Sequence, residues 1–215
     1  MSMKRTILIV SAVLIAFCFA HILRAQTPTT PDEKASQPRK TSGIFTMYAL
    51  DPLARSFCFN DGKEGMRIAN HQWGNRCSDL SFSLVSGGTL VSGIEVDRAA
   101  VIVDLGTNND LRERYGFDDT ENGAVGFASL RLEGNKIAVL QEDNNSKPVW
   151  TTLKEGAALF NETRASANAP IKLGHIYLVR IADSKNQGFR QIAKLMVIAY
   201  RPEESVTLRW ELLTK

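Results

Sequence analysis

The residues whose type and spacing point most directly to chemistry are two cysteines, Cys58 and Cys77, which could form a disulfide. The third cysteine, Cys18, lies inside an apolar N-terminal run, so these two remain for the rest of the chain. Such a pair in an oxidising compartment usually forms a disulfide, and a loop of about twenty residues closed in this way is worth ~3 kcal/mol. We therefore expect a disulfide between Cys58 and Cys77.

The segment between these cysteines carries side chains that suit recognition, namely His71, Trp73 and Arg76. Aromatic and arginine side chains contribute most of the binding energy in many interfaces, and a disulfide would fix the loop that carries them. We predict a recognition loop here. The alternative is that Trp73 packs beneath the loop and that the basic side chains are solvated.

An acidic segment at Asp118, Asp119 and Glu121 resembles the beginning of a calcium loop, with a glycine at its sixth position. Its twelfth position is Ser129, where an EF-hand requires a bidentate glutamate. A solvated acidic loop is therefore favoured over a calcium site. We expect no metal ion and no cofactor.

No sequence pattern in the chain predicts nucleophilic catalysis. It contains neither G-x-S-x-G nor S-x-x-K, and the disulfide would leave no free cysteine. The two histidines after residue 25, His71 and His175, are too far apart in sequence to predict a zinc site. One enzymatic alternative is a glycan-acting hydrolase, which needs two carboxylates across a cleft. Its candidate carboxylates are Asp104, Asp110, Glu113, Asp118, Asp119 and Glu121.

The N-terminal residues 1–25 read as a signal peptide. Lys4 and Arg5 precede an uncharged apolar run over residues 7–20, which is the order of a secretory signal. An uncleaved membrane anchor is the alternative, because residues 7–23 are about as long as the shortest spanning helix. Either way, the remainder of the chain is expected to be exported to the periplasm or the extracellular space.

Residues 26–42 form a linker and residues 43–215 a single domain. The linker is rich in proline, threonine and serine and has no apolar periodicity. Removing Lys4, Arg5 and Arg24 from the 26 basic residues leaves 23, equal to the 23 acidic residues. A domain without net charge has no broad field to attract phosphates, so nucleic acid is not an expected partner. A membrane is a partner only through an uncleaved N-terminal segment.

From residue 43 onward, short apolar runs alternate with turns that contain Gly, Asn, Asp and Pro. This pattern predicts an all-β fold that is mainly antiparallel, either a sandwich or a barrel-like structure. Strands are expected at residues 44–50, 56–59, 80–85, 89–96, 100–105, 124–132 and 136–141. The last three runs, 175–182, 190–200 and 205–213, predict a C-terminal three-stranded β-meander. Short helices are expected at 108–115 and 153–160.

The predicted meander also contains charged residues that could lie together on one face of its sheet. The run 190–200 is apolar on both faces apart from Lys194, as in a central strand. Depending on register, Lys194 shares a face with Arg180, Arg209 and Glu211. A solvated cross-strand charge ladder is then favoured over a ligand site.

These features together favour an exported β-rich protein that binds a ligand or an envelope component without catalysis. The alternatives are the carboxylate-dependent hydrolase and a membrane-tethered structural module. The expectation follows from a stable β-scaffold with polar and aromatic loops and from the lack of a catalytic motif in the sequence.

Overall fold

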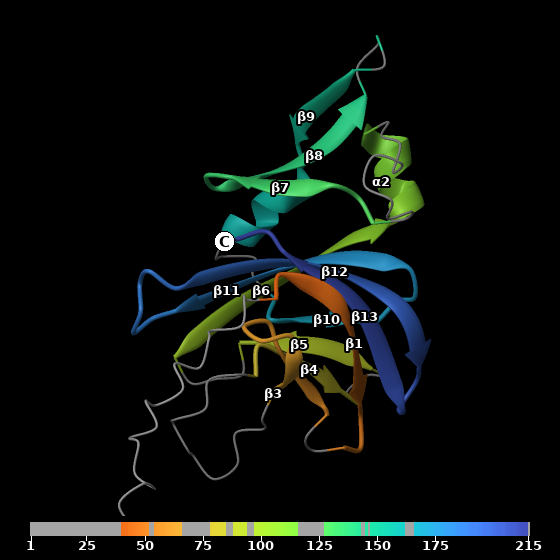
Figure 1. Ribbon diagram of the computed structural model, residues 1–215, viewed down its shortest axis with the longest axis vertical. Helices are drawn as coiled ribbons and strands as arrows, with labels where there is room; N and C mark the ends of the chain where they lie inside the picture. Colours follow the sequence, from red (N-terminus) through yellow and green to blue (C-terminus); the bar gives the residue numbers. More distant parts are fainter. Residues whose placement is uncertain are drawn as a thin grey trace, which may run out of the picture. The chain divides into compact units, whose positions relative to one another are not determined.

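The computed structural model describes residues 40–51, 54–65, 78–84, 88–93, 97–115, 127–142, 145, 147–161 and 166–214. All of them belong to one compact unit, residues 39–215. These residues form three antiparallel sheets, one α-helix and one 3₁₀-helix, as the sequence pattern predicts (Figure 1). The predicted signal segment and almost all of the predicted linker lie outside the described residues.

Two of the sheets have five strands each. Sheet A has the order β1 (Ser42–Tyr48), β13 (Ser205–Leu212), β12 (Arg190–Arg201), β11 (His175–Asp183), β6 (Arg98–Thr107). Sheet B has the order β10 (Asn168–Pro170), β5 (Thr89–Ser92), β4 (Leu80–Ser83), β2 (Ser56–Cys58), β3 (Lys63–Gly65). Both are open sheets within the described chain, so the fold is a sandwich and not a closed barrel.

The first core lies between sheets A and B. It contains Tyr177 and Trp210 from sheet A and Phe57 and Phe82 from sheet B, all of them fully buried. The rings of Phe57 and Trp210 meet edge to face, with centroids 5.2 Å apart. Strand β13 follows the expected alternation, because its even-numbered residues from 206 to 212 are buried and its odd-numbered residues are half-buried.

A second core covers the opposite face of sheet A. The covering layer consists of sheet C, in which β8 (Lys136–Glu142) lies between β7 (Leu130–Glu133) and β9 (Pro148–Thr152), together with α2 (Asn108–Tyr115) and the 3₁₀-helix η3 (Glu155–Phe160). Val139 of β8, Leu159 of η3 and Leu111 of α2 pack here against Leu178 and Ile192 of sheet A. Because both faces of sheet A are covered, its inner strands β11 and β12 are apolar on both sides.

The meander and the helix α2 match their predicted positions. Strands β11, β12 and β13 pair in sequence with antiparallel registers, and α2 has the expected bounds. The second predicted helix is a 3₁₀-helix that begins two residues later, at Glu155. Three short strands, β3, β9 and β10, were not expected from the sequence pattern.

The predicted strand 124–132 is shorter in its described part, where pairing begins only at Leu130. Residues 124–126 lie outside the described chain. Phe127 and Ala128 leave the ladder because they cover a buried lysine: the carbonyl oxygen of Ala128 accepts a hydrogen bond from Lys194, whose Nζ lies above the Phe127 ring. Lys194 and Phe127 both line the pocket that is described below as the candidate site.

Candidate functional site

The two loops predicted from the sequence as candidate sites lie outside the described residues. This applies to His71, Trp73 and Arg76 of the predicted recognition loop and equally to the acidic loop of Asp118, Asp119 and Glu121. Both remain predictions.

Cys58, by contrast, is described. It is fully buried and is disulfide-bonded. Its expected partner, Cys77, lies outside the described residues, so the pairing of Cys58 with Cys77 also stays a prediction.

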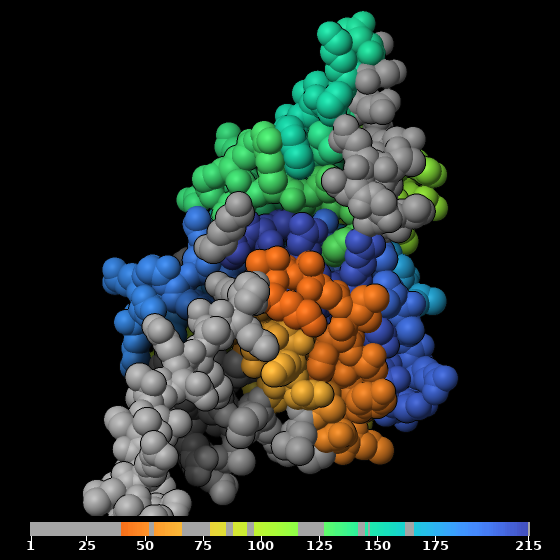
Figure 2. All heavy atoms as spheres, viewed as in Figure 1, coloured from red at the N-terminus to blue at the C-terminus, as the bar shows by residue number. Residues whose placement is uncertain are grey.

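A pocket of about 590 Å³ opens where sheet C leaves the outer strands of sheet A uncovered. We call it the cationic groove. Its described lining is residues 42–44 of β1, residues 209–211 of β13, Lys194 of β12, Trp150 of β9, and Phe127, Ser129 and Leu130. In Figure 2 the orange start of β1, the blue β13 and the green segment that contains β7 meet on the face shown. Sheet C has three strands and sheet A has five, so the groove is a step between two layers.

Lys194 forms the floor of the cationic groove. Its side chain is only 2% exposed, and its Nζ lies 2.7 Å from the carbonyl oxygen of Ala128 and 2.8 Å from Oε2 of Glu211. The same atom lies 3.8 Å from the ring centroid of Phe127. A buried ammonium is tolerated only when it is paired and hydrogen-bonded, and these three contacts meet that need.

The register confirms that Lys194 shares a face with the other charged residues of the meander. Glu211 lies directly opposite Lys194, and Arg209 lies opposite Met196. Arg180 lies opposite Ile192, two residues from Lys194, on the same face. The expectation of a solvated charge ladder is wrong for Lys194, because Phe127 and Ala128 bury its ammonium.

Arg209 is the charged group of the groove that has no hydrogen-bond acceptor among the described residues. Its guanidinium carbon lies 4.5 Å from the Phe127 ring centroid, and the residue is half-buried. Within the described chain no oxygen atom pairs with this guanidinium. Lys194 and Glu211 neutralise each other, so Arg209 gives the described lining a net charge of one positive unit. A guanidinium presents a planar set of N–H donors that matches carboxylate and phosphate oxygens.

Trp150 supplies an aromatic wall at the sheet C side of the groove. Its ring is covered by the guanidinium of Arg131, whose carbon lies 4.1 Å from the ring centroid. Arg131 is in turn paired with Glu133. The positive charge of Arg131 is therefore balanced, in contrast to that of Arg209.

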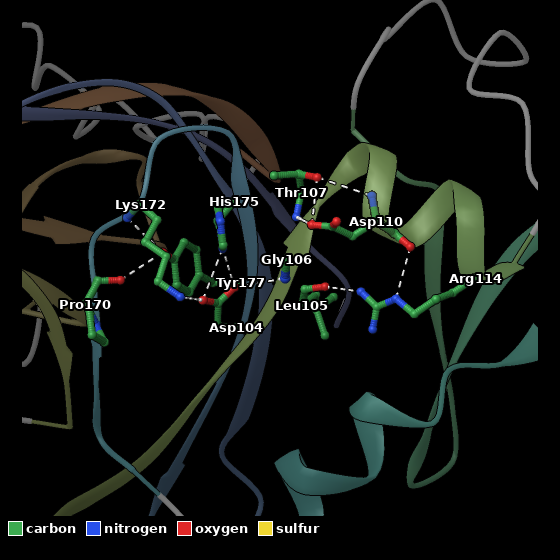
Figure 3. A network of polar contacts seen from close by, with 10 residues as sticks. All are labelled: Asp104, Leu105, Gly106, Thr107, Asp110, Arg114, Pro170, Lys172, His175 and Tyr177. Atoms are coloured by element: carbon green, nitrogen blue, oxygen red, sulfur yellow. Dashed lines mark hydrogen bonds and ion pairs between the residues drawn. The ribbon is translucent and has the colours of Figure 1, made fainter.

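Asp104, a candidate carboxylate of the hydrolase alternative, belongs to a polar network at the end of β6 (Figure 3). Its Oδ1 lies 2.8 Å from Nδ1 of His175 and accepts the backbone N–H of Gly106 at 2.9 Å. Its Oδ2 lies 3.0 Å from Nζ of Lys172. Burial raises the pKa of Asp104, but these hydrogen bonds outweigh burial and hold the pKa below 3.8.

Tyr177 closes the network on the side of the first core. Its hydroxyl donates to the carbonyl oxygen of Pro170 at 2.8 Å and accepts the backbone N–H of Lys172 at 3.0 Å. Burial, and then the negative charge of Asp104, raise the pKa of Tyr177 above 10. The network thus fixes the turn between β10 and β11 to the end of β6.

Asp110, the second candidate carboxylate, caps the helix α2. Its Oδ2 accepts the backbone N–H of Thr107 at 2.6 Å, and its own backbone N–H donates to Oγ1 of Thr107. These hydrogen bonds lower the pKa of Asp110. A glycan hydrolase needs one carboxyl group that stays protonated near neutral pH, and both Asp104 and Asp110 are held deprotonated. Glu113 is exposed on α2.

The described residues contain no group of three or more His, Cys, Asp or Glu side chains placed to hold a metal ion. In this part of the chain there is also no helix of the length and apolar character needed to span a membrane.

Comparison of the chain with protein-family models, with curated proteins and with solved structures finds no match.

One sequence signal pointed toward the cationic groove. Lys194 is the single charged residue between the two arginines that end the central strand β12, and an interior lysine must have a partner. The sequence pattern alone did not reveal Phe127 as its cover, because residues 124–132 read as a continuous strand. It also did not predict the role of Arg209, which depends on how far sheet C extends over sheet A.

Proposed function

We propose that residues 43–215 form an exported, non-enzymatic binding module that holds an anionic group of another molecule in the cationic groove. The observation that carries this proposal is the half-buried guanidinium of Arg209, which lines a pocket of about 590 Å³ and has no oxygen partner among the described residues. A charge-assisted hydrogen bond to a carboxylate or phosphate would use its free donors.

The chemistry of the groove favours binding over turnover. Its described lining residues include no histidine and no cysteine, and the carboxylate of Glu211 is paired with Lys194. The hydroxyls of Ser42 and Ser129 therefore have no histidine in the described lining that could serve as their general base. Trp150 and Phe127 supply the apolar surface that ligand pockets usually combine with a few polar groups.

Export is supported by the N-terminal sequence and by the disulfide at Cys58. Disulfides persist in oxidising compartments and are rare in the cytosol. We propose a periplasmic or extracellular location, with the Cys58–Cys77 bond stabilising the domain there.

Replacing Arg209 tests this function. Benzoate, inorganic phosphate and N-acetylglutamate serve as anionic probes, and tryptophan emission serves as the readout because Trp150 lines the groove. We expect at least one probe to give a saturable change, with the dissociation constant raised about tenfold or more in Arg209→Gln. The reason is that a charge-assisted hydrogen bond is worth roughly 1.5 to 3 kcal/mol.

The matched control is Arg190→Gln, which removes the same charge from an exposed arginine of β12 that binds Asn135 outside the groove. This variant should bind the probes as the unmodified protein does. Equal loss in both variants would indicate a general charge effect, and the absence of saturable binding for all three probes would refute the proposal.

A further inference from the structure

An exposed apolar surface lies beside the cationic groove, on the outer strands of sheet A. Sheet C, α2 and η3 cover the inner strands on this face, but β1 and the second half of β12 keep large exposed side chains. Ile44 is 65% exposed, Tyr48 is 48% exposed and Ile198 is 37% exposed. Large apolar side chains that gather on one exposed surface mark an interaction site.

The pairing registers put these side chains on one face, in line with Arg209. Alternate residues of a strand point to the same face, and directly opposite residues share it. Arg209 lies directly opposite Ile44 on one side and Met196 on the other. The register of β12 shifts at Ile198, which lies across from Thr207. We call the surface beyond Arg209 the open strip, and it consists of Ile44, Thr46, Tyr48, Met196, Ile198 and Thr207.

The open strip carries no charge, because none of its six residues is ionised at neutral pH. The hydroxyls of Thr46 and Thr207 hydrogen-bond each other, with their oxygens 2.9 Å apart. The other four side chains are apolar or aromatic. A ligand that lies on the strip is therefore held by burial of apolar surface.

Arg209 lies at one end of the open strip. Its guanidinium carbon is 4.5 Å from the ring centroid of Phe127, which also covers Lys194, so the guanidinium leans away from the strip and into the groove. From this end the strip follows β1. The four residue steps from Ile44 to Tyr48 span ~14 Å at about 3.4 Å each, which matches an extended alkyl chain of about eleven carbons.

The far end of the open strip meets a second pocket, of about 710 Å³. The described residues that line it are Tyr48, Leu50, Asp51, Pro202, Glu203 and Glu204. This lining contains no basic side chain, and Glu204 is already paired with Arg201. An anionic group therefore has its partner at the Arg209 end, whereas an apolar group has Tyr48 and Leu50, which are 48% and 83% exposed.

We propose that the anion held by Arg209 is the head group of a single-chain amphiphile, such as a fatty acid, whose alkyl chain lies along the open strip. The inference rests on the proposed function, because Arg209 binds the anionic group in both. Charge complementarity at Arg209 selects the head group. The continuity of an uncharged strip with the cationic groove selects the alkyl chain.

The step between the layers favours a single molecule over the surface of a bilayer. Sheet C, α2 and η3 stand on the same face of sheet A as the open strip (Figure 1). A flat membrane would meet this layer before it reached the half-buried guanidinium of Arg209 at the base of the step. A flexible alkyl chain can lie along the base of the step.

A series of hexanoate, octanoate, decanoate and dodecanoate tests both ends of the ligand. Binding to the exported chain is measured by isothermal titration calorimetry, below the concentrations at which micelles form. Full burial of a methylene group strengthens binding about fourfold, so a strip that covers one side of the chain should give about twofold. We expect the dissociation constant to fall about twentyfold or more from hexanoate to dodecanoate. The uncharged 1-decanol should bind about tenfold more weakly than decanoate.

Two variants separate the head group from the alkyl chain. Arg209→Gln should weaken every member of the series by a similar factor, about tenfold. Ile198→Thr should weaken dodecanoate about fourfold and hexanoate less than about twofold, because the shorter chain ends before it reaches this side chain. Leu84→Thr is the matched control, since Leu84 is 36% exposed and follows β4 of sheet B, on the other side of sheet A. It should leave the whole series unchanged.

The remaining outcomes separate this inference from the proposed function. If phosphate or all four carboxylates bind equally well through Arg209, the open strip holds no alkyl chain and the anion site stands. If affinity rises with chain length but Arg209→Gln has no effect, both the head-group site and the proposed function are wrong. Equal losses in Ile198→Thr and Leu84→Thr would also refute the inference.

Other occupants of the open strip are revealed by the same variant. If vesicles of phosphatidylglycerol sediment the exported chain and Ile198→Thr abolishes this, a bilayer covers the strip and the inference is wrong. If light scattering shows a dimer that dodecanoate leaves intact and Ile198→Thr dissociates, a second copy covers the strip and the inference is equally wrong.

Discussion

At the scale of single residues, neighbouring charges in the described part of this domain differ in whether they have hydrogen-bond partners. His175 and Lys172 together hold the carboxylate of Asp104, and Glu211 and Ala128 hold the ammonium of Lys194. Arg209 shares the aromatic ring of Phe127 with Lys194 but has no acceptor among the described residues. This difference between neighbouring cations is why we place the binding site at Arg209.

The lowered pKa of Asp104 predicts a dependence of stability on pH. A carboxyl group with a folded-state pKa below its unfolded value of 3.8 stabilises the fold above that pH, and the contribution is lost as the pH falls through the folded value. Asp104→Asn should cost about 1 kcal/mol at pH 7, which is less than the roughly 1.5 to 3 kcal/mol of a charge-assisted hydrogen bond, because the Asp104 side chain is 26% exposed and solvent screens its charge.

Urea unfolding at pH 7 and at pH 3 measures this effect. The stability difference between the unmodified protein and Asp104→Asn should be smaller at pH 3 than at pH 7. Glu113→Gln is the control, since Glu113 is exposed on α2, and its effect should be the same at both pH values. A constant difference for Asp104→Asn would show that the network with His175 does not stabilise the charged carboxylate.

At the scale of elements, those with a local sequence signal were predictable, and those that depend on pairing with a distant strand were not. Helix α2 was predictable because Thr107 and Asp110 cap it locally. The meander was predictable because its alternation persists over three long runs. The short strand β10 was not, because its three residues, Asn168–Pro170, carry no periodicity and owe their conformation to pairing with β5.

The 3₁₀-helix η3 depends on a glycine for its close approach to sheet C. A Cβ at Gly156 would lie 2.9 Å from Cβ of Ile137 in β8. Gly156→Ala should therefore destabilise the domain by about 1 to 3 kcal/mol through overpacking of the second core. Thermal unfolding followed by circular dichroism measures the effect.

Gly188→Ala serves as the matched control for this prediction. A Cβ at Gly188 would meet only Oδ1 of Asn186, at 3.5 Å, and should leave the midpoint of unfolding nearly unchanged. An equal midpoint for the two alanine variants would show that η3 is not tightly packed on β8.

At the scale of the whole unit, a buried ion network links the two sheets of the sandwich. Arg98 at the start of β6 pairs with Asp79, which precedes β4 of sheet B, and its Nε lies 4.0 Å from Oδ2 of Asp183 at the end of β11. The three side chains are at most 7% exposed. The hydrophobic pattern predicted strands next to these positions but could not predict this cluster, because charged residues near strand ends are normally solvated.

Removing the central charge of that cluster should be costly. Arg98→Met leaves two buried carboxylates without their cation, and breaking a buried pair in this way typically costs about 3 to 5 kcal/mol. Chemical unfolding should show this loss, and Arg98→Met combined with Asp79→Asn should recover part of it. An unchanged midpoint of unfolding for the single variant would mean that the cluster does not hold sheets A and B together.

The most direct test of the central proposal is to observe the guanidinium of Arg209 itself. In a ¹H–¹⁵N NMR titration with benzoate, the Nε–Hε signal of Arg209 should shift with saturation, together with the amide signals of residues 42–44 and 209–211 that line the groove. The Nε–Hε signal of Arg190 should not move. Saturating shifts that cluster elsewhere, with Arg209 unaffected, would contradict the assignment of the cationic groove as the binding site.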